Sequence, residues 1–440
     1  MSIKVVKFGG SSLADAEHFR QVASIIKADP QRRYVVPSAP GKRFSGDEKV
    51  TDMLYACYNM AKANENIDVT YSKICDRYNS IIADLGLDFD ISGELEYIKN
   101  AILQRRSGRD FAASRGEYLN GIILAKYLGF DFIDAENVIF FKDNGTYDHE
   151  LTYKVLSEEL KKHEYAIIPG FYGAMPNGTI KTFSRGGSDI TGSIVANAAG
   201  ATLYENWTDV SGFMTADPRV VENPVSIDTV TYRELRELAY MGATVLHDEA
   251  IFPVRAASIP INIRNTNDPS APGTMIVESA EGYDAERVIT GIAGKGGFSA
   301  ITVEVEKMNS TLGFSRRVLE ILEDHGMNIE HLPTGIDTMS LIVHTEELDQ
   351  CREKLVNSFN RMLRPVSLTI EDGLALVAVV GRGMVNAKGT AARIFKAVSD
   401  ANINIRMIDQ GSSELNIILG IDEKDYIAAV RAIYNEFCKK

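Results

Sequence analysis

Two glycine-rich turns in the first half of the chain have the residues to bind phosphate. The first, Gly9-Gly10-Ser11-Ser12, follows a short β-branched run that ends at Phe8 and precedes a segment with helical spacing. A turn between a strand and a helix offers free backbone N–H groups and the positive end of the helix dipole, and Lys7 would add a positive charge. Glycine is also common at such turns for geometry alone, so both interpretations stay open here.

The second turn, Phe183–Asp189, again precedes a helical pattern and carries the guanidinium of Arg185, two hydroxyls and a carboxylate. Ser188 or Asp189 could instead cap the following helix, but capping does not explain Arg185. A third polar segment, residues 207–219, is rich in groups that could meet ribose, base edges and phosphate, although a long surface loop would look the same. The chain has neither GxxxxGK[ST] nor a GxGxxG that opens a helix after a strand, which disfavours P-loop and dinucleotide-binding schemes.

These turns need a scaffold, and the hydrophobic pattern predicts alternating strands and helices around them. We expect strands at residues 3–8, 34–36, 130–133, 138–141, 165–168, 202–204 and 259–263. We expect helices at residues 14–28, 153–162, 188–199, 232–241 and 248–257, and a mostly helical excursion from about residue 49 to 126. Such alternation is typical of an α/β fold with a largely parallel sheet and helices on both faces.

The last third of the chain contains an internal repeat. Gly313 and the pair Asn328-Ile329 recur, 76 residues later, as Gly389 and the pair Asn404-Ile405. Each copy reads as strand, loop, helix, strand, strand. Flanking strands are expected at 300–305, 340–344, 374–380 and 414–419. A repeat of this kind can be a duplication without a ligand or a pair of small-molecule sites, and the pattern alone leaves both open.

Length and composition exclude several classes of protein. The 440 residues allow about three domains, and 45% hydrophobic with 24% charged residues is ordinary for a globular protein. A net charge of -13 without a dense Lys/Arg run disfavours nucleic-acid binding. The four cysteines form no CxxC pair and the histidines show no metal-ligand spacing, so we expect reduced thiols. The longest charge-free stretch, residues 165–180, is broken by prolines and glycines, and no secretory segment is visible, so we expect a cytoplasmic protein without a membrane span.

Taken together, the polar segments resemble the aspartate kinases of the amino acid kinase superfamily. The matching strings, in the family's order, are Val6–Ser12, Ser114–Glu117, Ser184–Asp189, Thr208–Gly212 with Thr215–Arg219, and Gly242–His247. The repeat resembles the paired ACT domains of the same enzymes. The resemblance implies a three-layer αβα kinase domain at 1–285 and two α+β, ferredoxin-like ACT units at 286–365 and 366–440, the second open to completion by a strand from about 286–297. No second catalytic module is visible, so we expect a monofunctional kinase.

The resemblance implies transfer of the γ-phosphoryl group of ATP to the β-carboxylate of L-aspartate. The product would be 4-phospho-L-aspartate, and the reaction would begin lysine, threonine and methionine biosynthesis. A carboxylate with a pKa of about 4 is already ionised at pH 7, so no general base is needed. Catalysis then depends on positioning and charge stabilisation, with Mg²⁺ held mainly by the phosphates and not by a metal site of the protein.

The resemblance also assigns residues to these roles. The catalytic residues would be Lys7, Gly9, Gly10 and Asp189. Aspartate would be bound by Ser38, Thr51, Glu117, Arg185, Gly186, Gly187 and Ser188. ATP would be bound by Lys7, Gly9, Gly10, Ser11, Thr208, Asp209, Met214 and Arg219. Within these sets Asp189 would orient Lys7, Arg185 would engage a carboxylate bidentately, and Glu117 would face the substrate ammonium.

Three departures from the family pattern bear on these roles. Residues Pro40–Val50 interrupt the second motif, which makes the placement of Thr51 less direct and could form a mobile lid. Thr244 stands where many members have lysine, so another cation such as Lys181 would replace it, or nucleotide binding is weaker. The string Leu332–Ser340 is unlike the Thr-Thr-Ser-Glu string of the lysine-sensitive enzymes, which leaves the effector less defined.

ACT units bind small amino acids where the loop after the first strand meets the helix, often between two units. The resemblance places the effector at Met308, Ser310, Thr311, Gly313, Phe314, Ser315, Asn328, Ile329, Glu330 and Gly335. Lysine is the first choice and threonine the second, acting on the conformations of a homodimer or a dimer of dimers formed through the ACT units. The alternatives are another kinase of the superfamily, acting on glutamate, acetylglutamate or a nucleoside monophosphate, and an amino-acid sensor with a degenerate kinase domain.

Overall fold

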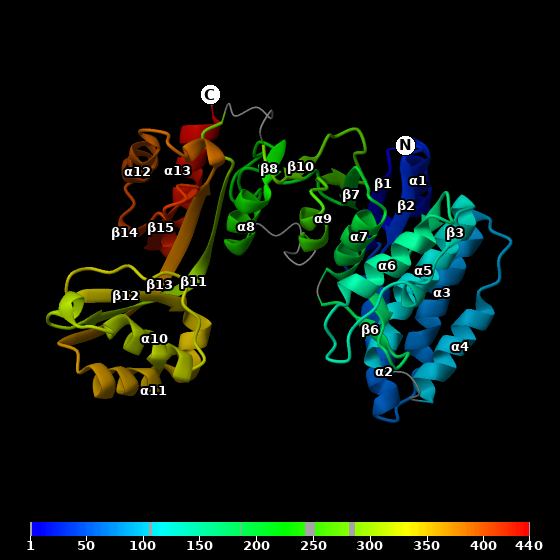
Figure 1. Ribbon diagram of the computed structural model, residues 1–440, viewed down its shortest axis with the longest axis horizontal. Coiled ribbons are helices and arrows are strands. Elements are labelled where there is room, and N and C mark those ends of the chain that lie inside the picture. Colours follow the sequence, from blue (N-terminus) through cyan, green and yellow to red (C-terminus); the bar gives the residue numbers. More distant parts are fainter. Residues whose placement is uncertain (1, 105–107, 185, 243–250, 281–286, 440) are drawn as a thin grey trace. The chain divides into compact units, whose positions relative to one another are not determined.

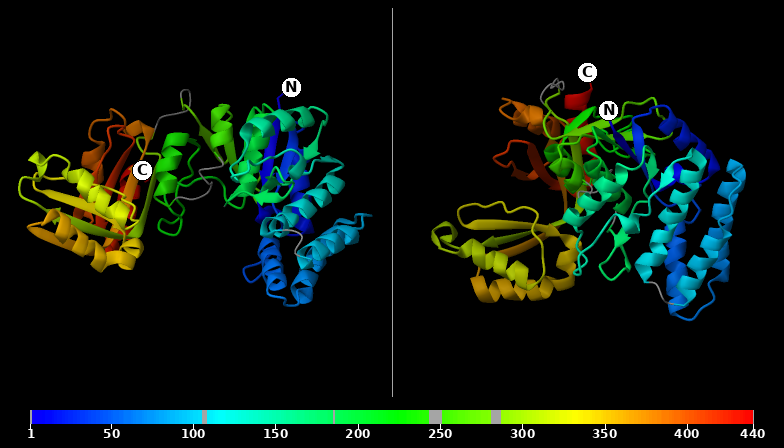
Figure 2. Two further views of the ribbon diagram at one scale, coloured as in Figure 1. Left: turned by 60° about the horizontal axis from the view of Figure 1, so that its bottom comes forward. Right: turned by 45° about the vertical axis from the view of Figure 1, so that its right-hand side comes forward.

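The structure is a computed structural model that describes residues 2–104, 108–184, 186–242, 251–280 and 287–439 (Figures 1 and 2). The backbone forms two compact units, each made of several chain segments. Unit 1 comprises Met1–Phe213, Asp228–Tyr232 and Val245–Glu281, and unit 2 comprises Met214–Ile227, Arg233–Thr244 and Gly282–Lys440. Two segments that precede the predicted boundary at residue 285 therefore belong to unit 2.

Unit 1 is built on an eight-stranded sheet in the order β3-β4-β2-β1-β7-β9-β10-β8. Neighbouring strands are parallel, except for the antiparallel pair β9 and β10. The strands are β1 (Lys4–Phe8), β2 (Arg32–Pro37), β3 (Asp131–Phe132), β4 (Ala166–Ile167), β7 (Leu203–Thr208), β8 (Thr229–Thr231), β9 (Ile261–Asn265) and β10 (Thr274–Val277). The predicted largely parallel sheet is confirmed.

Helices cover this sheet. They are α1 (Ala16–Lys27), α2 (Val50–Lys62), α3 (Asp68–Leu85), α4 (Ser92–Leu103), α5 (Arg109–Leu128), α6 (His149–Leu160), α7 (Gly187–Ala198) and α9 (Phe252–Ala256), with 3-10 turns η1 (Gly10–Leu13) and η2 (Ala135–Asn137). The predicted helical excursion is confirmed as α2 to α5, whose apolar faces share one core cluster with α1. Leu54, Ile74 and Ile98 of α2, α3 and α4 are fully buried in it.

Alternate residues of β1 face opposite layers of unit 1. Val6 and Phe8 pack in the core cluster that includes α1, and the Phe8 ring stacks on Trp207 with ring centroids 6.0 Å apart. Lys7 points to the other layer, where it meets Asp189 in the first turn of α7. Helices α1 and α7 therefore cover opposite faces, and the charged end of β1 is directed at the start of α7.

One local prediction in unit 1 is wrong, and one element was not predicted. The strand expected at 138–141 is absent among the described residues, where Phe140 and Phe141 make only isolated bridges. The turn η2 closes at Val138, which leaves too few extended residues for a strand. An antiparallel hairpin that the pattern did not predict begins in the charge-free stretch and ends just beyond it, β5 (Tyr172–Ala174) with β6 (Ile180–Thr182).

Unit 2 contains one antiparallel sheet in the order β12-β11-β13-β15-β14. Its strands are β11 (Gly291–Glu304), β12 (Thr338–His344), β13 (Ser367–Val380), β14 (Ile405–Asp409) and β15 (Asn416–Asp422). Its helices are α8 (Tyr232–Tyr240), α10 (Phe314–Asp324), α11 (Thr345–Leu363), α12 (Thr390–Asp400) and α13 (Tyr426–Cys438), with turns η4 (Met308–Ser310), η5 (Arg382–Met384) and η6 (Glu423–Asp425). The central strands β11 and β13 each have 14 residues and pair almost end to end, so both copies of the repeat share them.

The repeat is visible in the backbone. Gly313 and Gly389 both adopt the left-handed conformation, with φ of 74° and 89°, directly before α10 and α12. Glycine adopts this conformation at low cost, which explains why it recurs. The second copy shows the predicted strand, loop, helix, strand, strand order. The first copy does not, because only isolated bridges at His331 and Thr334 replace the penultimate strand, and Pro333 between them has no N–H to donate.

Helix α8 is attached to the rest of unit 2 by buried polar contacts. Glu234 is 0% exposed and accepts from the backbone N–H of Arg382 at 2.8 Å and from its guanidinium at 3.1 Å. The Thr290 hydroxyl donates to the same carboxylate. One turn further on, Glu237 accepts from the amide of Asn416 at 2.6 Å. The helix therefore belongs with the sheet of unit 2, although it continues directly from β8 of unit 1.

Candidate functional site

Three polar side chains with little solvent exposure meet at the carboxyl end of β1. Lys7 Nζ lies 2.5 Å from Asp189 Oδ1 and 3.4 Å from Asn206 Oδ1, and Asn206 Nδ2 donates to the same Asp189 oxygen at 2.8 Å. Lys7 is 7% exposed and Asn206 is 3% exposed. The three residues come from β1, α7 and β7, so strand and helix packing together fix a positive charge at this edge of the sheet.

The glycine turn after β1 has no room for a side chain at Gly10. A β-carbon on Gly10 would lie 2.8 Å from the carbonyl oxygen of Ala39, and one on Gly41 would lie 2.6 Å from the carbonyl carbon of Gly10. The N–H of Gly41 donates to the Gly10 carbonyl at 2.8 Å. Two loops therefore touch through bare backbone beside Lys7, whose Nζ would be 3.7 Å from a β-carbon on Gly9. Such a turn offers backbone N–H groups to an anion.

Glu117, in α5, is a buried carboxyl with one unpartnered oxygen. It is 5% exposed, and its Oε2 has no hydrogen-bond partner in the protein. Burial raises the pKa of Glu117 to about 8, although the backbone N–H of Ala39 opposes this by donating to the carboxylate. One turn further along α5, Asn120 donates to the Ser38 carbonyl at 2.7 Å. The predicted substrate residues Ser38 and Glu117 thus lie in the same region.

The start of α7 is also built from close backbone contacts. Gly186 is left-handed, with φ of 73°, and Gly187 opens the helix. A β-carbon on Gly170 would lie 2.7 Å from the Ser188 Cβ, and the N–H of Gly170 donates to the last residue of β2. Ser188 is therefore tied to the end of β2, after which Ser38 follows. Arg185 lies outside the described residues.

Thr51 lies in the first turn of α2, after the inserted loop. Ion pairs hold this loop: the Asp47 carboxylate is 2.8 Å from Arg43 and 2.6 Å from Arg77. The side chain of Arg43, more than that of Arg77, holds the pKa of Asp47 well below its usual range against the effect of burial. Arg77 also donates to the carbonyl of Gly41 at 2.9 Å. The loop is thus pinned beside the glycine turn, which does not favour a mobile lid.

The residues expected at the nucleotide divide between the two units. In unit 1, Thr208 ends β7 and its hydroxyl donates to Asp209 at 3.3 Å. Met214 and Arg219 belong to unit 2. The Arg219 side chain is 86% exposed and lies 2.6 Å from Asp217. The structure brings Thr208 to the same edge of the sheet as Asn206, two residues earlier on β7, and the roles of Met214 and Arg219 stay predictions.

The cation expected to replace the missing lysine is already paired. Lys181, in β6, lies 3.4 Å from Asp110 at the start of α5, and its side chain is 42% exposed. It could therefore exchange this partner for a phosphate at low cost, because exposed ion pairs contribute little. Thr244 and the rest of its motif up to His247 lie outside the described residues.

The predicted effector residues lie on two neighbouring segments of unit 2. Met308 and Ser310 belong to η4, Gly313 precedes α10, Phe314 and Ser315 open α10, and Thr311 lies between. The N–H of Asn309 donates to the carbonyl of Ile336 at 3.2 Å, which brings this loop against Gly335.

On the second segment, the N–H of Asn328 donates to Glu347 at 3.2 Å, and Ile329 follows. Glu330 has a 5% exposed side chain that lies 3.1 Å from His344 and leaves Oε2 without a partner. Burial and the Glu330 carboxylate raise the pKa of Tyr240, at the end of α8, to about 12. The second segment therefore contacts α8 as well as the sheet of unit 2.

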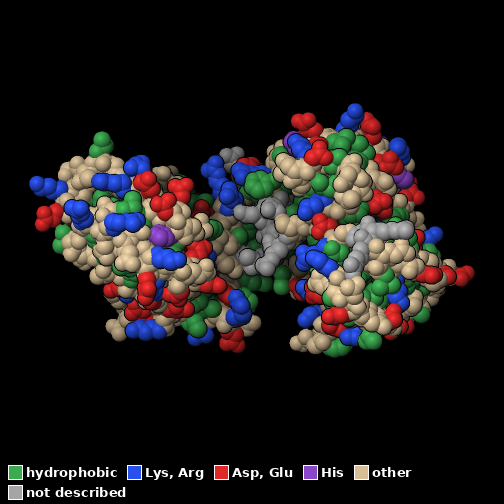
Figure 3. Space-filling model, turned by 90° about the horizontal axis from the view of Figure 1, so that it is seen from below, with side chains coloured by type: hydrophobic (Ala, Val, Ile, Leu, Met, Phe, Trp, Pro, Cys, Tyr) green, Lys and Arg blue, Asp and Glu red, His purple; other side chains and the backbone are tan. Residues whose placement is uncertain are grey.

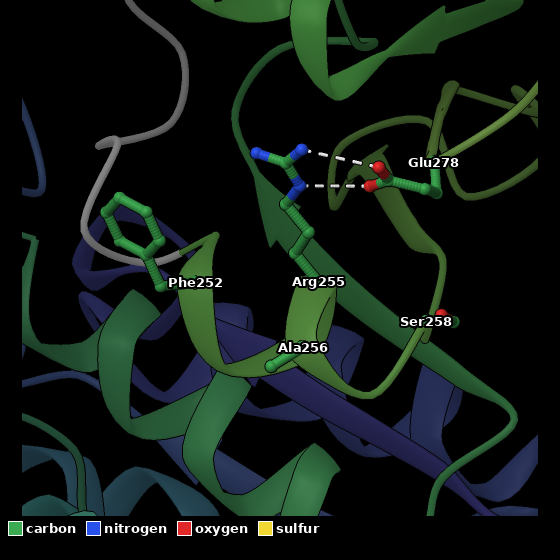
Figure 4. A pocket seen from close by; sticks show the side chains of 5 residues that line it. All are labelled: Phe252, Arg255, Ala256, Ser258 and Glu278. Atoms are coloured by element: carbon green, nitrogen blue, oxygen red, sulfur yellow. Dashed lines mark hydrogen bonds and ion pairs between the residues drawn. The ribbon is translucent and has the colours of Figure 1, made fainter.

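A separate pocket of about 430 Å³ lies at α9 and is lined by Phe252, Arg255, Ala256, Ser258 and Glu278. Figure 4 shows its cation, Arg255, turned toward Glu278, with nitrogen–oxygen distances of 3.0 and 3.3 Å. None of the predicted site residues lines this pocket. Its charges satisfy each other, so we do not assign the chemistry to it.

Metal and membrane features can be assessed only for the described part of the chain. There, no three His, Cys, Asp or Glu side chains are grouped so that they could hold a metal ion. No helix in that part is long and apolar enough to span a membrane. The face in Figure 3 shows acidic and basic side chains interspersed, without a continuous basic patch on it.

Sequence reasoning missed two residues of this site. Asn206 lies between the strand expected at 202–204 and the polar segment 207–219, and it was assigned to neither. An amide between Glu205 and Trp207 is nevertheless a visible signal, because buried polar side chains need partners. Asn120 gave no such signal, since α5 contains many small and polar residues and nothing in the sequence distinguishes this one. Both became apparent only from their contacts with Asp189 and Ser38.

Comparisons with known proteins agree with this geometry. The model of the amino acid kinase family matches residues 2–265, and a model of the ACT domain matches residues 377–437. Aspartokinase 3 of Bacillus subtilis is 39% identical over 452 residues, which cover 99% of this chain and 98% of that protein. A bifunctional aspartokinase/homoserine dehydrogenase of Haemophilus influenzae is 29% identical over 98% of this chain, which spans 56% of its length.

Solved structures show the same relationship. The aspartate kinase of Clostridium acetobutylicum has a TM-score of 0.94 at 51% identity, covering 99% of this chain and 100% of that one. Aspartokinase III of E. coli in complex with aspartate and ADP has a TM-score of 0.75 at 26% identity, covering 99% of each chain. These matches confirm the predicted fold class, a kinase domain followed by ACT units. The chain therefore belongs to the amino acid kinase family, and within it to the aspartate kinases, ATP-dependent phosphotransferases that phosphorylate the β-carboxylate of L-aspartate.

Proposed function

We propose that the cluster of Lys7, Asp189 and Asn206 at the carboxyl edge of the unit 1 sheet, the Lys7 cluster, performs the phosphoryl transfer. One observation supports this most: a nearly buried ammonium, paired with Asp189, lies beside a turn whose residues Gly9 and Gly10 carry no side chains. The acceptor carboxylate needs no base, so the protein has to supply fixed positive charge and backbone donors. Lys7 would stabilise the transferring phosphoryl group, Asp189 would orient Lys7, and Gly9, Gly10 and Ser11 would contact the phosphates.

L-Aspartate would bind between the loop after β2 and the start of α7. Glu117 would take the substrate ammonium, because its unpartnered Oε2 is the kind of acceptor that an ammonium satisfies. Arg185 would hold a carboxylate bidentately, as its planar fork allows. The hydroxyls and backbone of Ser38, Thr51, Gly186, Gly187 and Ser188 would complete the site.

ATP would enter as its magnesium complex. The ion would be held mainly by the phosphates and would neutralise charge that develops on them during transfer. The residues present fit this arrangement, since Lys7 and the glycine turn supply a cation and backbone donors for the same phosphates. Thr208, Asp209, Met214 and Arg219 would border the nucleotide, and Lys181 could add a charge where lysine is missing at Thr244.

Trapping of the acyl phosphate with hydroxylamine tests the activity directly. We expect hydroxamate when the protein receives Mg-ATP with aspartate, and none with glutamate or UMP. Lys7→Met should abolish it, whereas Lys73→Met, which removes an exposed lysine paired with Glu48, should not. Hydroxamate formation with glutamate instead of aspartate would identify another kinase of the superfamily, and no turnover with any substrate would identify a sensor.

Regulation is the second part of the proposal. Aspartokinase III of E. coli has been solved in complex with lysine and aspartate in a T-state. We propose that lysine, with threonine as second choice, binds at the loop 308–315 and the segment 328–336, and that ACT units of two chains pair in a homodimer or a dimer of dimers. Leu312 and Ile336 are 100% and 71% exposed there, which suits an interface. Calorimetry that detects neither amino acid, with kinetics unchanged by millimolar amounts of both, would refute it.

A further inference from the structure

The Lys7 cluster contains a residue to which the aspartate kinase pattern assigns no role. Asn206 lies in the middle of β7, between Glu205 and Trp207, and is 3% exposed. Its amide nitrogen donates to Asp189 Oδ1 at 2.8 Å, and its carbonyl oxygen lies 3.4 Å from Lys7 Nζ. One side chain therefore contacts both members of the Lys7–Asp189 pair.

We propose that Asn206 is a positioning residue that aims the Lys7 ammonium at the transferring phosphoryl group. This inference rests on the proposed function, because it takes the Lys7 cluster as the place of transfer. Asn206 touches neither substrate in the proposal and acts only through Lys7 and Asp189.

The first step of the argument concerns the donors of Lys7. An ammonium has three N–H donors and no acceptor. Asp189 accepts one of them at 2.5 Å, and Asn206 lies within reach of a second at 3.4 Å. These two acceptors come from α7 and β7, so the third donor is left for a ligand. The Gly9 turn lies next to this ammonium, since Nζ would be only 3.7 Å from a β-carbon on Gly9.

The second step concerns Asp189. Lys7 and the Asn206 amide both bind the same oxygen, Oδ1. Without the amide, the carboxylate could rotate and take Lys7 with it, because Lys7 would then be the one side chain described as bound to it. A shift of the ammonium by about 1 Å is enough to lower a rate by about 100-fold. The amide thus fixes the carboxylate, and the carboxylate fixes the lysine.

A matched control residue lies on the adjacent strand. Asn262 of β9 is paired with Glu205 in the sheet register and is 7% exposed. Its amide nitrogen donates to the carbonyl of Pro272 at 3.2 Å. It is therefore a buried strand asparagine of the same sheet whose described contacts do not include Lys7 or Asp189.

The test compares Asn206→Leu, Asn206→Asp and Asn262→Leu in the full chain, with Lys7→Met as reference. We expect Asn206→Leu to lower kcat about 10- to 100-fold with the aspartate KM changed less than about threefold, and Asn262→Leu to leave kcat within about threefold. Asn206→Asp, which keeps the shape, should lower kcat at least as much once it is ionised, because a carboxylate cannot donate to Asp189 and adds negative charge near the phosphate. Its loss should deepen as the pH rises and the added carboxyl ionises.

Melting temperatures separate positioning from folding. If Asn206→Leu retained kcat, if Asn206→Asp matched the wild type, or if both leucine variants lost kcat in proportion to their melting temperatures, the inference would be overturned. If Lys7→Met were itself active, the proposed function would fail instead, so the two failures are distinguishable.

Discussion

At the residue scale, the proposed role of Glu117 couples substrate binding to the release of a proton. Burial raises the pKa of Glu117 to about 8, so below that pH the carboxyl of the free protein is largely protonated. An ammonium ligand favours the ionised form and lowers this pKa when it binds. The proposed role of Glu117 therefore requires a proton to leave whenever aspartate binds near neutral pH.

We expect isothermal titration of the protein with aspartate at pH 7, in buffers of different ionisation enthalpy, to show release of nearly one proton per site. The sign follows from the raised pKa: the free carboxyl holds a proton at pH 7 and the bound one does not. Release should vanish near pH 9.5, where the free carboxyl is already ionised, and affinity should rise as the pH increases toward 8.

Glu117→Gln is the control for this measurement. It should bind aspartate more weakly, and it should release no proton at either pH, because an amide does not titrate. Proton uptake by the wild type, or equal release by Glu117→Gln, would show that Glu117 does not hold the ammonium.

Sequence reasoning at this scale succeeded where the type of a residue indicates its chemical role. Lys7 and Asp189 were expected to pair, and their atoms lie 2.5 Å apart. Asn206 and Glu234 were not singled out, because amides and carboxylates are so common that only their burial and partners mark them. Burial of this kind depends on contacts between residues more than a hundred positions apart, such as Asn206 with Lys7 and Glu234 with Arg382.

At the scale of elements, the loops after β1 and β2 act as one structure. The backbone of Gly41 fits directly against that of Gly10, and a β-carbon at either position would meet main-chain atoms at 2.6 to 2.8 Å. Main-chain atoms cannot rotate away as a side chain can, so a methyl group there has to separate the loops.

We expect Gly41→Ala to lower kcat/KM for ATP by about 100-fold, because the glycine turn moves away from Lys7. Gly93→Ala is the matched control: Gly93 lies in α4, a β-carbon there meets nothing within 4 Å, and alanine favours a helix by about 1 kcal/mol. Steady-state kinetics with the melting temperature of each variant checks this. Full activity of Gly41→Ala would mean that the close approach of the two loops is not needed.

The attachment of α8 provides the second prediction at this scale. Glu234→Gln should loosen the helix, because glutamine cannot match a carboxylate that accepts from the Arg382 backbone, its guanidinium and the Thr290 hydroxyl together. A cost of about 1 to 3 kcal/mol is usual for such a loss. Hydrogen exchange of the amides in Arg233–Tyr240 should become faster by the corresponding factor.

Glu237→Gln serves as its control. Glu237 lies one turn away, is only partly buried and accepts from a neutral amide, that of Asn416. Its substitution should change exchange in α8 much less. Equal acceleration in both variants would mean that the buried contacts of Glu234 do not hold the helix.

Elements with strong periodicity were predictable, and those set by tertiary contacts were not. Strands β1 and β2 and helices α1 and α7 appear where the pattern placed them. The hairpin of β5 and β6 was missed because Pro176 and Gly178, which broke the apolar run in the sequence, form the turn between its strands. The strand expected at 138–141 does not form, because its first residue, Val138, is the C-cap of η2.

At the scale of the whole molecule, the chain passes between the two units several times. The division by contacts places crossings at residues 213, 227, 232, 244 and 281. The segment 214–227 contributes Ala216, Val220 and Val221 to the core of unit 2, where they cluster with Val377 and Leu419 among others. The apolar side chains of this segment therefore depend on residues far beyond 285 for their burial.

This dependence predicts how a fragment that ends at residue 285 should behave. It retains Val220 and Val221, which are 7% and 5% exposed in the full chain, but lacks the strands that cover them. We expect the fragment to aggregate and to bind a hydrophobic dye, because newly exposed apolar patches associate. Replacement of both valines by serine should have opposite effects: it should improve the solubility of the fragment, and it should lower the melting temperature of the full chain, where it buries hydroxyls and leaves cavities. Equal solubility of the two fragments would show that the segment finds cover within the first 285 residues, and the kinase part would then fold without its regulatory sheet.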